Sequence, residues 1–70
     1  MKRAPVDSTA ILSAGYDPDT RTLEIQFQDG RVYRYLQVPP VVYRDLMAAD
    51  SPGRYFDWYI KTTFACHPVE

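Results

Sequence analysis

The sequence is poor in the residue types that supply cross-links and metal sites. It contains one cysteine, Cys66, and one histidine, His67, which adjoin each other near the C-terminal end. A single cysteine cannot form an intramolecular disulfide, and a structural zinc site needs two further ligands. Nucleophilic catalysis needs a base oriented by a third group, and one histidine in a terminal segment offers no such set. We therefore expect no metal, no cofactor and no enzymatic activity.

The sequence also lacks an excess of one charge and a long apolar run. Eight Lys and Arg residues stand against nine Asp and Glu residues, for a net charge of −1. No overall positive field therefore attracts nucleic acid or anionic lipid, and a nucleic-acid site would have to be local. Nowhere do about 18 consecutive apolar residues occur, and no apolar run follows the charged first residues. We expect a cytoplasmic protein without a membrane partner.

What the chain does contain is enough apolar material for one small core. Hydrophobic residues make up 46% of its 70 residues and aromatic residues 14%, a composition typical of folded rather than disordered chains. At this length, folding buries only about 60% of the surface that the unfolded chain exposes. We expect a single domain of modest stability.

Three segments have the pattern of β-strands. In residues 23–28, Leu, Ile and Phe alternate with polar residues, which is the period of a strand with one buried face. Residues 8–16 are short and apolar in the middle, and residues 31–38 are rich in branched and aromatic side chains. Turn-forming residues separate the three segments at positions 17–20 and 29–30. This order predicts a three-stranded antiparallel meander.

The loop at Asp29 and Gly30 decides which face of the sheet carries the tyrosines. A two-residue loop would place Tyr33 and Tyr35 on the polar face of the hairpin. A three-residue loop, with Gly30 in a left-handed bulge, would place both tyrosines on the apolar face. The cross-strand pairs would then be Ile25 with Tyr33, Leu23 with Tyr35, and Glu24 with Arg34. We favour the three-residue loop because it opposes apolar with aromatic residues and unlike charges with each other.

Two helices are predicted after the strands. Pro39 and Pro40 end the third strand, and residues 40–49 have the apolar spacing of an amphipathic helix. Ser51 is the expected N-cap of a second helix with Pro52 at its first position. The apolar face of that helix is predicted to consist of Tyr55, Phe56, Tyr59, Ile60, Thr63 and Phe64.

The fold class is therefore α+β, with the order β-β-β-α-α. Residues 1–7 are expected to form a mobile N-terminal arm, residues 8–64 the single domain, and residues 65–70 a C-terminal tail. One contiguous core is expected from Leu23, Ile25, Phe27, Leu46, Phe56 and Ile60.

A series of short patterns occurs in order along residues 8–64. They are Gly15-Tyr16-Asp17, Leu23-x-Ile-x-Phe27, Asp29-Gly30, Tyr33-Arg34-Tyr35, Val38-Pro39, Ser51-x-Gly53-x-Tyr55-Phe56 and Ile60-Lys61. In this order they resemble the KTSC domain family, whose name comes from a domain at the C-terminus of some lysyl-tRNA synthetases. The central Tyr-x-Tyr is the most recognisable element.

The resemblance implies a small accessory binding domain, here as a free-standing bacterial protein. The role of the family is not established, and RNA binding has been suggested because of the synthetase connection. The chain departs from the family at Asp57 and Phe64, where many relatives carry asparagine and tyrosine. These two changes leave the fold intact but would remove a polar contact if the family uses one there.

Two sets of residues are candidates for binding tRNA or single-stranded RNA. Tyr33 and Tyr35 could form a stacking platform on an exposed sheet face, or they could pack in the core, as the favoured register indicates. Arg54, Trp58 and Lys61 share a flank of the second helix, where the indole could stack on a base while the cations hold phosphates.

Less specific interpretations of the second set remain open. Asp57 lies between the two cations, so the flank could be a salt-bridged surface with Trp58 packed against the arm or a sheet edge. Alternatively, Trp58 could serve a protein–protein interaction module together with an uncovered strip of Val32 and Leu36. The sequence fixes neither the ligand nor the oligomeric state.

Overall fold

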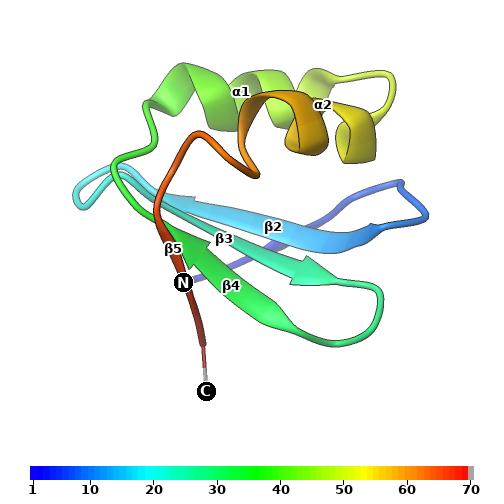
Figure 1. Ribbon diagram of the computed structural model, residues 1–70, viewed down its shortest axis with the longest axis horizontal. Coiled ribbons are helices and arrows are strands. Elements are labelled where there is room, and N and C mark those ends of the chain that lie inside the picture. Colours follow the sequence, from blue (N-terminus) through cyan, green and yellow to red (C-terminus); the bar gives the residue numbers. More distant parts are fainter. Residues whose placement is uncertain (70) are drawn as a thin grey trace.

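An antiparallel sheet lies beneath two short helices (Figure 1). The computed structural model describes residues 1–69, and its strands follow one another across the sheet in chain order. The strands are β1 (Ala4–Pro5), β2 (Ile11–Asp17), β3 (Thr22–Phe27), β4 (Val32–Tyr35) and β5 (Cys66–Pro68). The helices are α1 (Pro40–Ala48) and α2 (Pro52–Tyr59). The α+β class is confirmed, with both helices on one face of the sheet.

The prediction of a three-stranded meander was incomplete. The meander corresponds to β2, β3 and β4, and a short strand is added at each edge. Strand β1 pairs with β2 from within the segment expected to be an arm, and β5 pairs with β4 from within the expected tail. The two strands have two and three residues, too few for an apolar period to be visible. Each contains a proline, which limits pairing beyond the edge.

The predicted hairpin register is confirmed. Leu23 pairs with Tyr35, Glu24 with Arg34 and Ile25 with Tyr33. Gly30 has a φ of 92°, and its amide donates a hydrogen bond of 2.9 Å to the Phe27 carbonyl. The Phe27 amide donates in turn to the Arg31 carbonyl at 2.8 Å, which closes a three-residue loop with a glycine bulge. Glycine fits this position because it adopts positive φ without a steric penalty.

Helix α1 ends one residue before the predicted end, and α2 begins as predicted. The Ser51 hydroxyl accepts a hydrogen bond of 3.4 Å from the Arg54 amide, which caps α2. The predicted apolar face of α2 was too wide, because the helix ends at Tyr59, whose side chain is 55% exposed. The amides of Ile60 and Lys61 both donate to the Phe56 carbonyl and close the last turn.

The core lies between the helices and the sheet. Its buried hydrophobic residues are Ile11, Ala14, Leu23, Ile25, Tyr35, Val38, Leu46, Phe56 and Ile60. The predicted core is confirmed for five of its six members, and the sixth, Phe27, is partly buried against them. The Phe56 ring lies edge-on to Phe27 and Tyr35, with centroid separations of 5.3 and 5.5 Å. Phe56 thereby anchors α2 to β3 and β4.

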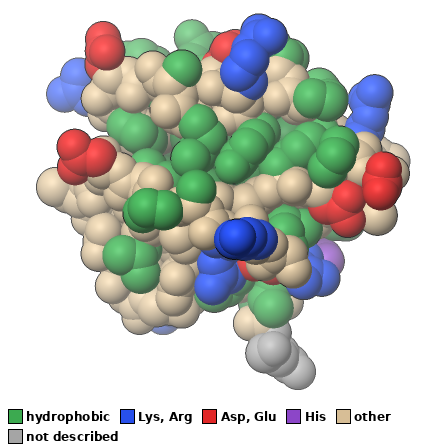
Figure 2. Space-filling view, turned by 180° about the vertical axis from the view of Figure 1, so that it is seen from behind, with side chains coloured by type: hydrophobic (Ala, Val, Ile, Leu, Met, Phe, Trp, Pro, Cys, Tyr) green, Lys and Arg blue, Asp and Glu red, His purple; other side chains and the backbone are tan. Residues whose placement is uncertain are grey.

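Partly buried hydrophobic side chains extend the core toward the surface. Figure 2, which views the molecule from the opposite side, shows a band of such side chains between the helix layer and the sheet. At one end of the layers Tyr16 stacks on Tyr43 of α1, with ring centroids 5.4 Å apart. The Tyr16 hydroxyl also donates a hydrogen bond to the Val38 carbonyl. Neither helix in residues 1–69 is long and apolar enough to cross a membrane.

Candidate nucleic-acid interface

The most exposed aromatic side chains of the molecule lie on α2. Trp58 is 69% exposed and Tyr59 is 55% exposed. The Tyr59 ring lies 4.9 Å from the Tyr55 ring and 6.5 Å from the Trp58 ring, measured between centroids. These three aromatic residues line a shallow hollow of about 260 Å³ together with Arg54 and residues 49–51, which include Asp50. We call Arg54, Tyr55, Trp58 and Tyr59 the α2 patch.

The packing of the helix explains why Trp58 faces outward. Phe56 and Ile60, four residues apart, hold the inner face of α2 against the core. Trp58 follows Phe56 by two residues and so projects about 200° around the helix axis from it. Burying a large apolar ring is favourable by roughly 1.5–3 kcal/mol, and this chain leaves most of its one tryptophan in solvent. An exposed tryptophan of this kind is typical of a binding surface rather than a structural one.

The structure brings two of the three candidate residues on this flank together. Arg54 and Trp58 line the same hollow. Lys61 lies beyond the end of α2, is exposed, and is absent from that lining. Tyr55 and Tyr59 join the site although the sequence assigned them to the buried face. Tyr55 is partly buried against the core, in keeping with its predicted place on the apolar face. The exposure of Tyr59 depends on where α2 ends, which helical spacing alone does not specify.

The alternative of a salt-bridged helix surface is not observed. Within residues 1–69, Asp57 makes no ion pair with Arg54 or Lys61. Asp57 instead lines another, polar hollow next to residues 7–10, and Arg54 lines this hollow too. Trp58 is not packed against the arm or a sheet edge, since most of its surface is exposed.

Tyr33 and Tyr35 lie on the helix-covered face of the sheet. Tyr35 is 4% exposed, and the Tyr33 ring packs edge-on to Phe27 at 6.1 Å. The core interpretation of these tyrosines is therefore confirmed, and they do not form an exposed stacking platform. Burial raises the pKa of Tyr35 from 10.0 to about 12, with smaller contributions from Cys66 and Tyr33.

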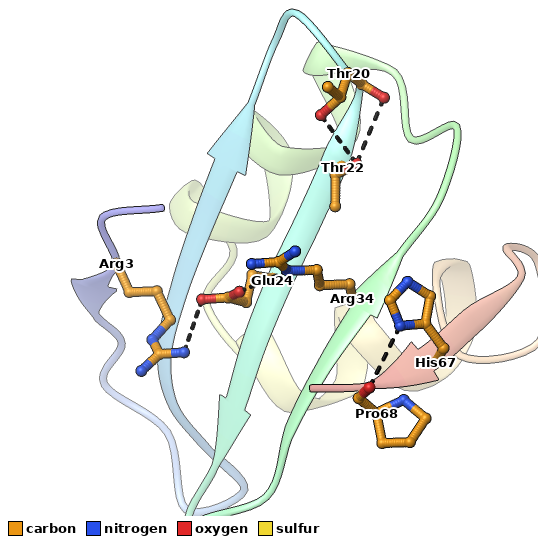
Figure 3. Close-up of polar contacts among 7 residues, drawn as sticks. All are labelled: Arg3, Thr20, Thr22, Glu24, Arg34, His67 and Pro68. Atoms are coloured by element: carbon orange, nitrogen blue, oxygen red, sulfur yellow. Dashed lines mark hydrogen bonds and ion pairs between the residues drawn. The ribbon is translucent and has the colours of Figure 1, made fainter. Parts of the chain in front are cut away.

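A buried ion cluster occupies the face of the sheet away from the helices, which we call the outer face (Figure 3). Glu24 is 4% exposed, and each of its carboxylate oxygens accepts a hydrogen bond from one arginine. Arg3 reaches it from the N-terminal segment at 2.8 Å, and Arg34 reaches it from β4 at 2.9 Å. Two arginines and one glutamate leave this cluster with a charge of +1. The pairing of Glu24 with Arg34 was predicted, whereas Arg3 was missed.

Gly15 allows the N-terminal segment to come this close. A Cβ atom at Gly15 would lie 2.5 Å from the Lys2 carbonyl oxygen and 3.1 Å from Cγ of Arg3. Contacts of 2.5 Å are not tolerated against backbone, so the absence of a side chain is required here. Gly15 in the middle of β2 was the sequence signal for a close backbone approach.

No set of metal ligands accompanies these groups. Within residues 1–69, no three His, Cys, Asp or Glu side chains lie close enough together to hold a metal ion. Cys66 is an exposed free thiol on β5, and His67 lies opposite Arg34 in the β4–β5 pair.

The sheet, the two helices and the central Tyr-x-Tyr hairpin define the class of protein. The chain belongs to the KTSC domain family, whose model matches residues 7–64. It is similar to the crystal structure of a KTSC domain protein from Yersinia pestis, with a TM-score of 0.93 and 50% identity. That match covers 99% of this chain and 97% of the other.

Two further relatives place the domain in different contexts. An uncharacterised protein of Stutzerimonas stutzeri (strain A1501) is 46% identical over 61 residues, covering 87% of this chain and 86% of the relative. A lysine–tRNA ligase of Nostoc punctiforme is 41% identical over 58 residues, covering 83% of this chain and 10% of the ligase. The chain therefore corresponds to a small part of that enzyme.

Proposed function

We propose that this KTSC domain is a small accessory binding domain that contacts single-stranded RNA through the α2 patch. The observation that carries the proposal is Trp58, 69% exposed beside Arg54 on a helix that is otherwise anchored in the core. A base can stack on the indole while Arg54 pairs with a phosphate, and Lys61 can reach a neighbouring phosphate from just beyond the helix. Such stacking contributes about 1–3 kcal/mol per base and tolerates any sequence.

Charge considerations make the interaction weak. The chain as a whole has a net charge of −1, so attraction comes from the cations near Trp58 and not from the overall field. Two phosphate contacts on a single strand correspond to a slope of about −1.4 in the logarithm of affinity against that of salt concentration. Weak contact suits an accessory domain that adds to the affinity of a larger assembly.

The names of some relatives support the proposal of an RNA ligand. Lysine–tRNA ligases, in which a related segment makes up about a tenth of the enzyme, are named for a reaction on tRNA. The proposed role here is binding without catalysis, in the cytoplasm.

Fluorescence anisotropy of a labelled single-stranded oligonucleotide and of labelled tRNA, at low and physiological salt, tests the proposal. Trp58→Ala should weaken binding about 5- to 150-fold, which corresponds to the stacking free energy above. Trp58→Phe should restore part of it because an aromatic face remains. Leu12→Ala is the matched control, since Leu12 is also exposed, at 42%, but lies in β2.

The α2 patch also supports a second function, a protein-interaction module. The rings of Tyr55, Trp58 and Tyr59 give the hollow a mainly apolar lining, which an apolar side chain of a partner could fill. Val32 and Leu36 do not belong to the α2 patch. Val32 lies on strand β4 and Leu36 is the residue after that strand, and both are toward the outer face. Binding of a partner that survives nuclease treatment, resists added salt and is lost in Trp58→Ala would favour this function over RNA binding.

A further inference from the structure

A second hollow lies on the outer face, away from the α2 patch. It has a volume of about 510 Å³ and is bordered by the N-terminal segment, the β2–β3 turn, β4 and β5. Its polar lining consists of Lys2, Asp17, Thr20, Thr22, Arg34 and His67. Figure 3 shows Thr22, Arg34 and His67 on the same face of the sheet as Glu24. We call this hollow the outer groove.

Positive groups outnumber negative ones around the outer groove. Among the lining residues within positions 1–69, Lys2 and Arg34 carry positive charge and Asp17 is the one acidic residue. The Asp17 carboxylate accepts a hydrogen bond from the Asp19 amide at 3.0 Å. One of its two oxygens is therefore already bonded within the β2–β3 turn. The nearby Glu24 is neutralised by its two arginines.

Arg34 is fixed by one hydrogen bond and keeps further N–H donors free. Its Nε atom donates to Glu24, which fixes the plane of the guanidinium. Within residues 1–69, its two terminal nitrogens have no hydrogen-bonded acceptor, and its side chain is 40% exposed. A planar guanidinium fixed on one side and open on the other matches the geometry of a phosphate group.

We propose that the outer groove binds a phosphate monoester, with Arg34 and Lys2 as charged ligands and His67 as a further polar side chain beside it. Donors that converge from the N-terminal segment and β4 suit a compact dianion with three free oxygens. A phosphodiester within a strand presents only two. Leu36, also in the lining, gives the group attached to the phosphate an apolar contact.

This site is independent of the RNA contact proposed for α2, since the two surfaces share no residue. The phosphate could belong to a free small molecule or to the 5′ end of a nucleic acid. Adenosine monophosphate, a 5′-phosphorylated trinucleotide and the same trinucleotide without the phosphate distinguish these sources.

Titration of the isotope-labelled chain, followed by NMR amide shifts, tests the proposal. Inorganic phosphate and adenosine monophosphate should shift the amides of Thr20, Thr22, Arg34 and His67 and leave that of Trp58 unchanged. Lys2→Ala and His67→Gln should each weaken phosphate binding at least threefold. Arg34→Lys should weaken it more, because the charge stays near Glu24 but the guanidinium is lost. Arg44→Ala, at an exposed arginine of α1 whose one ion pair within residues 1–69 is with its neighbour Asp45 at 3.6 Å, is the control.

The outcomes separate this site from the α2 patch. Unchanged phosphate binding in Trp58→Ala supports an independent site, whether or not RNA binds to α2. Binding of the phosphorylated trinucleotide but not its unphosphorylated form also supports a monoester site. If phosphate shifts no outer-groove amide, if Lys2→Ala and His67→Gln bind like the parent, or if the unphosphorylated trinucleotide binds there equally, the proposal is wrong.

Discussion

Arg34 Nε lies 2.9 Å from Glu24 Oε1, and the two residues are direct partners in the β3–β4 ladder. A shift of β4 by one residue against β3 would move Arg34 to the core face, leave Glu24 on the outer face and so separate the pair. The contact therefore requires the same register that places Tyr33 and Tyr35 among apolar residues. Arg3 completes the cluster and ties the N-terminal segment to the sheet.

Removing the charge of Glu24 should destabilise the fold. In Glu24→Gln the amide oxygen can accept from only one arginine and the NH2 group faces the other at a side chain that is nearly buried, and we expect a loss of about 1–3 kcal/mol. Urea unfolding measures it. Asp45→Asn, which breaks the exposed Arg44–Asp45 pair, should change stability by less than about 0.5 kcal/mol. Equal midpoints for Glu24→Gln and the parent would contradict a structural role for the cluster.

Adding a methyl group at Gly15 should displace the N-terminal segment. The new Cβ would meet the Lys2 carbonyl oxygen at 2.5 Å, so β1 has to move away and the Arg3–Glu24 contact should break. Hydrogen exchange should show faster exchange at the Val6 amide, which donates to the Leu12 carbonyl at 3.0 Å. Gly53→Ala is the matched control, because its Cβ would meet nothing closer than 3.5 Å. That change, within α2, should raise stability by about 0.5–1 kcal/mol. Unaltered exchange in Gly15→Ala would show that β1 is not held as described.

Truncation of two aromatic residues on α2 should change the stability of the fold by very different amounts. Phe56→Ala removes the ring that contacts Phe27 and Tyr35 and should cost about 3–5 kcal/mol. Trp58→Ala removes a mostly exposed ring and should change stability by about 0.5 kcal/mol or less. Thermal melting of both variants checks this. A melting temperature for Phe56→Ala equal to that of the parent would overturn the core assignment.

Alkaline pH should weaken the fold through Tyr35. Its pKa is about 12 in the folded chain and 10.0 when unperturbed. Below pH 10 the Tyr35 hydroxyl holds its proton in both the folded and the unfolded chain, and its full contribution to the free energy of unfolding is present. Between these values the unfolded chain releases the proton first, so the free energy of unfolding falls as pH rises. Urea unfolding over this range should show the fall, and Tyr35→Phe should reduce it. A slope that is the same in both proteins would contradict the burial of this hydroxyl.

Local patterns predicted most of the fold, because the residues involved act within one element or across one turn. The alternation around Ile25, the Gly30 bulge and the Ser51 cap each depend on near neighbours in the sequence. Strands β1 and β5 were missed because they exist only where an edge strand is already present to pair with.

The candidate site was predicted in part for the same reason. Trp58 and Arg54 share a helical flank by spacing alone, which requires no knowledge of the rest of the fold. Tyr59 was assigned to the apolar face of the second helix because its spacing from Phe56 suits a longer helix, whereas α2 ends at that residue. Arg3 could not be placed from its own neighbours, because its partner Glu24 is 21 residues away.

Trp58 is the one tryptophan in the sequence, so its own fluorescence reports on the proposed contact without a label. In the native chain it should be accessible to a neutral quencher, in keeping with its 69% exposure. Titration with a single-stranded oligonucleotide should quench the emission as bases stack on the indole. The logarithm of affinity should fall against the logarithm of salt concentration with a slope of about −1.4 in the native chain. In Lys61→Ala the slope should be about −0.7. Emission that does not change with oligonucleotide, even at low salt, would contradict RNA binding through the α2 patch.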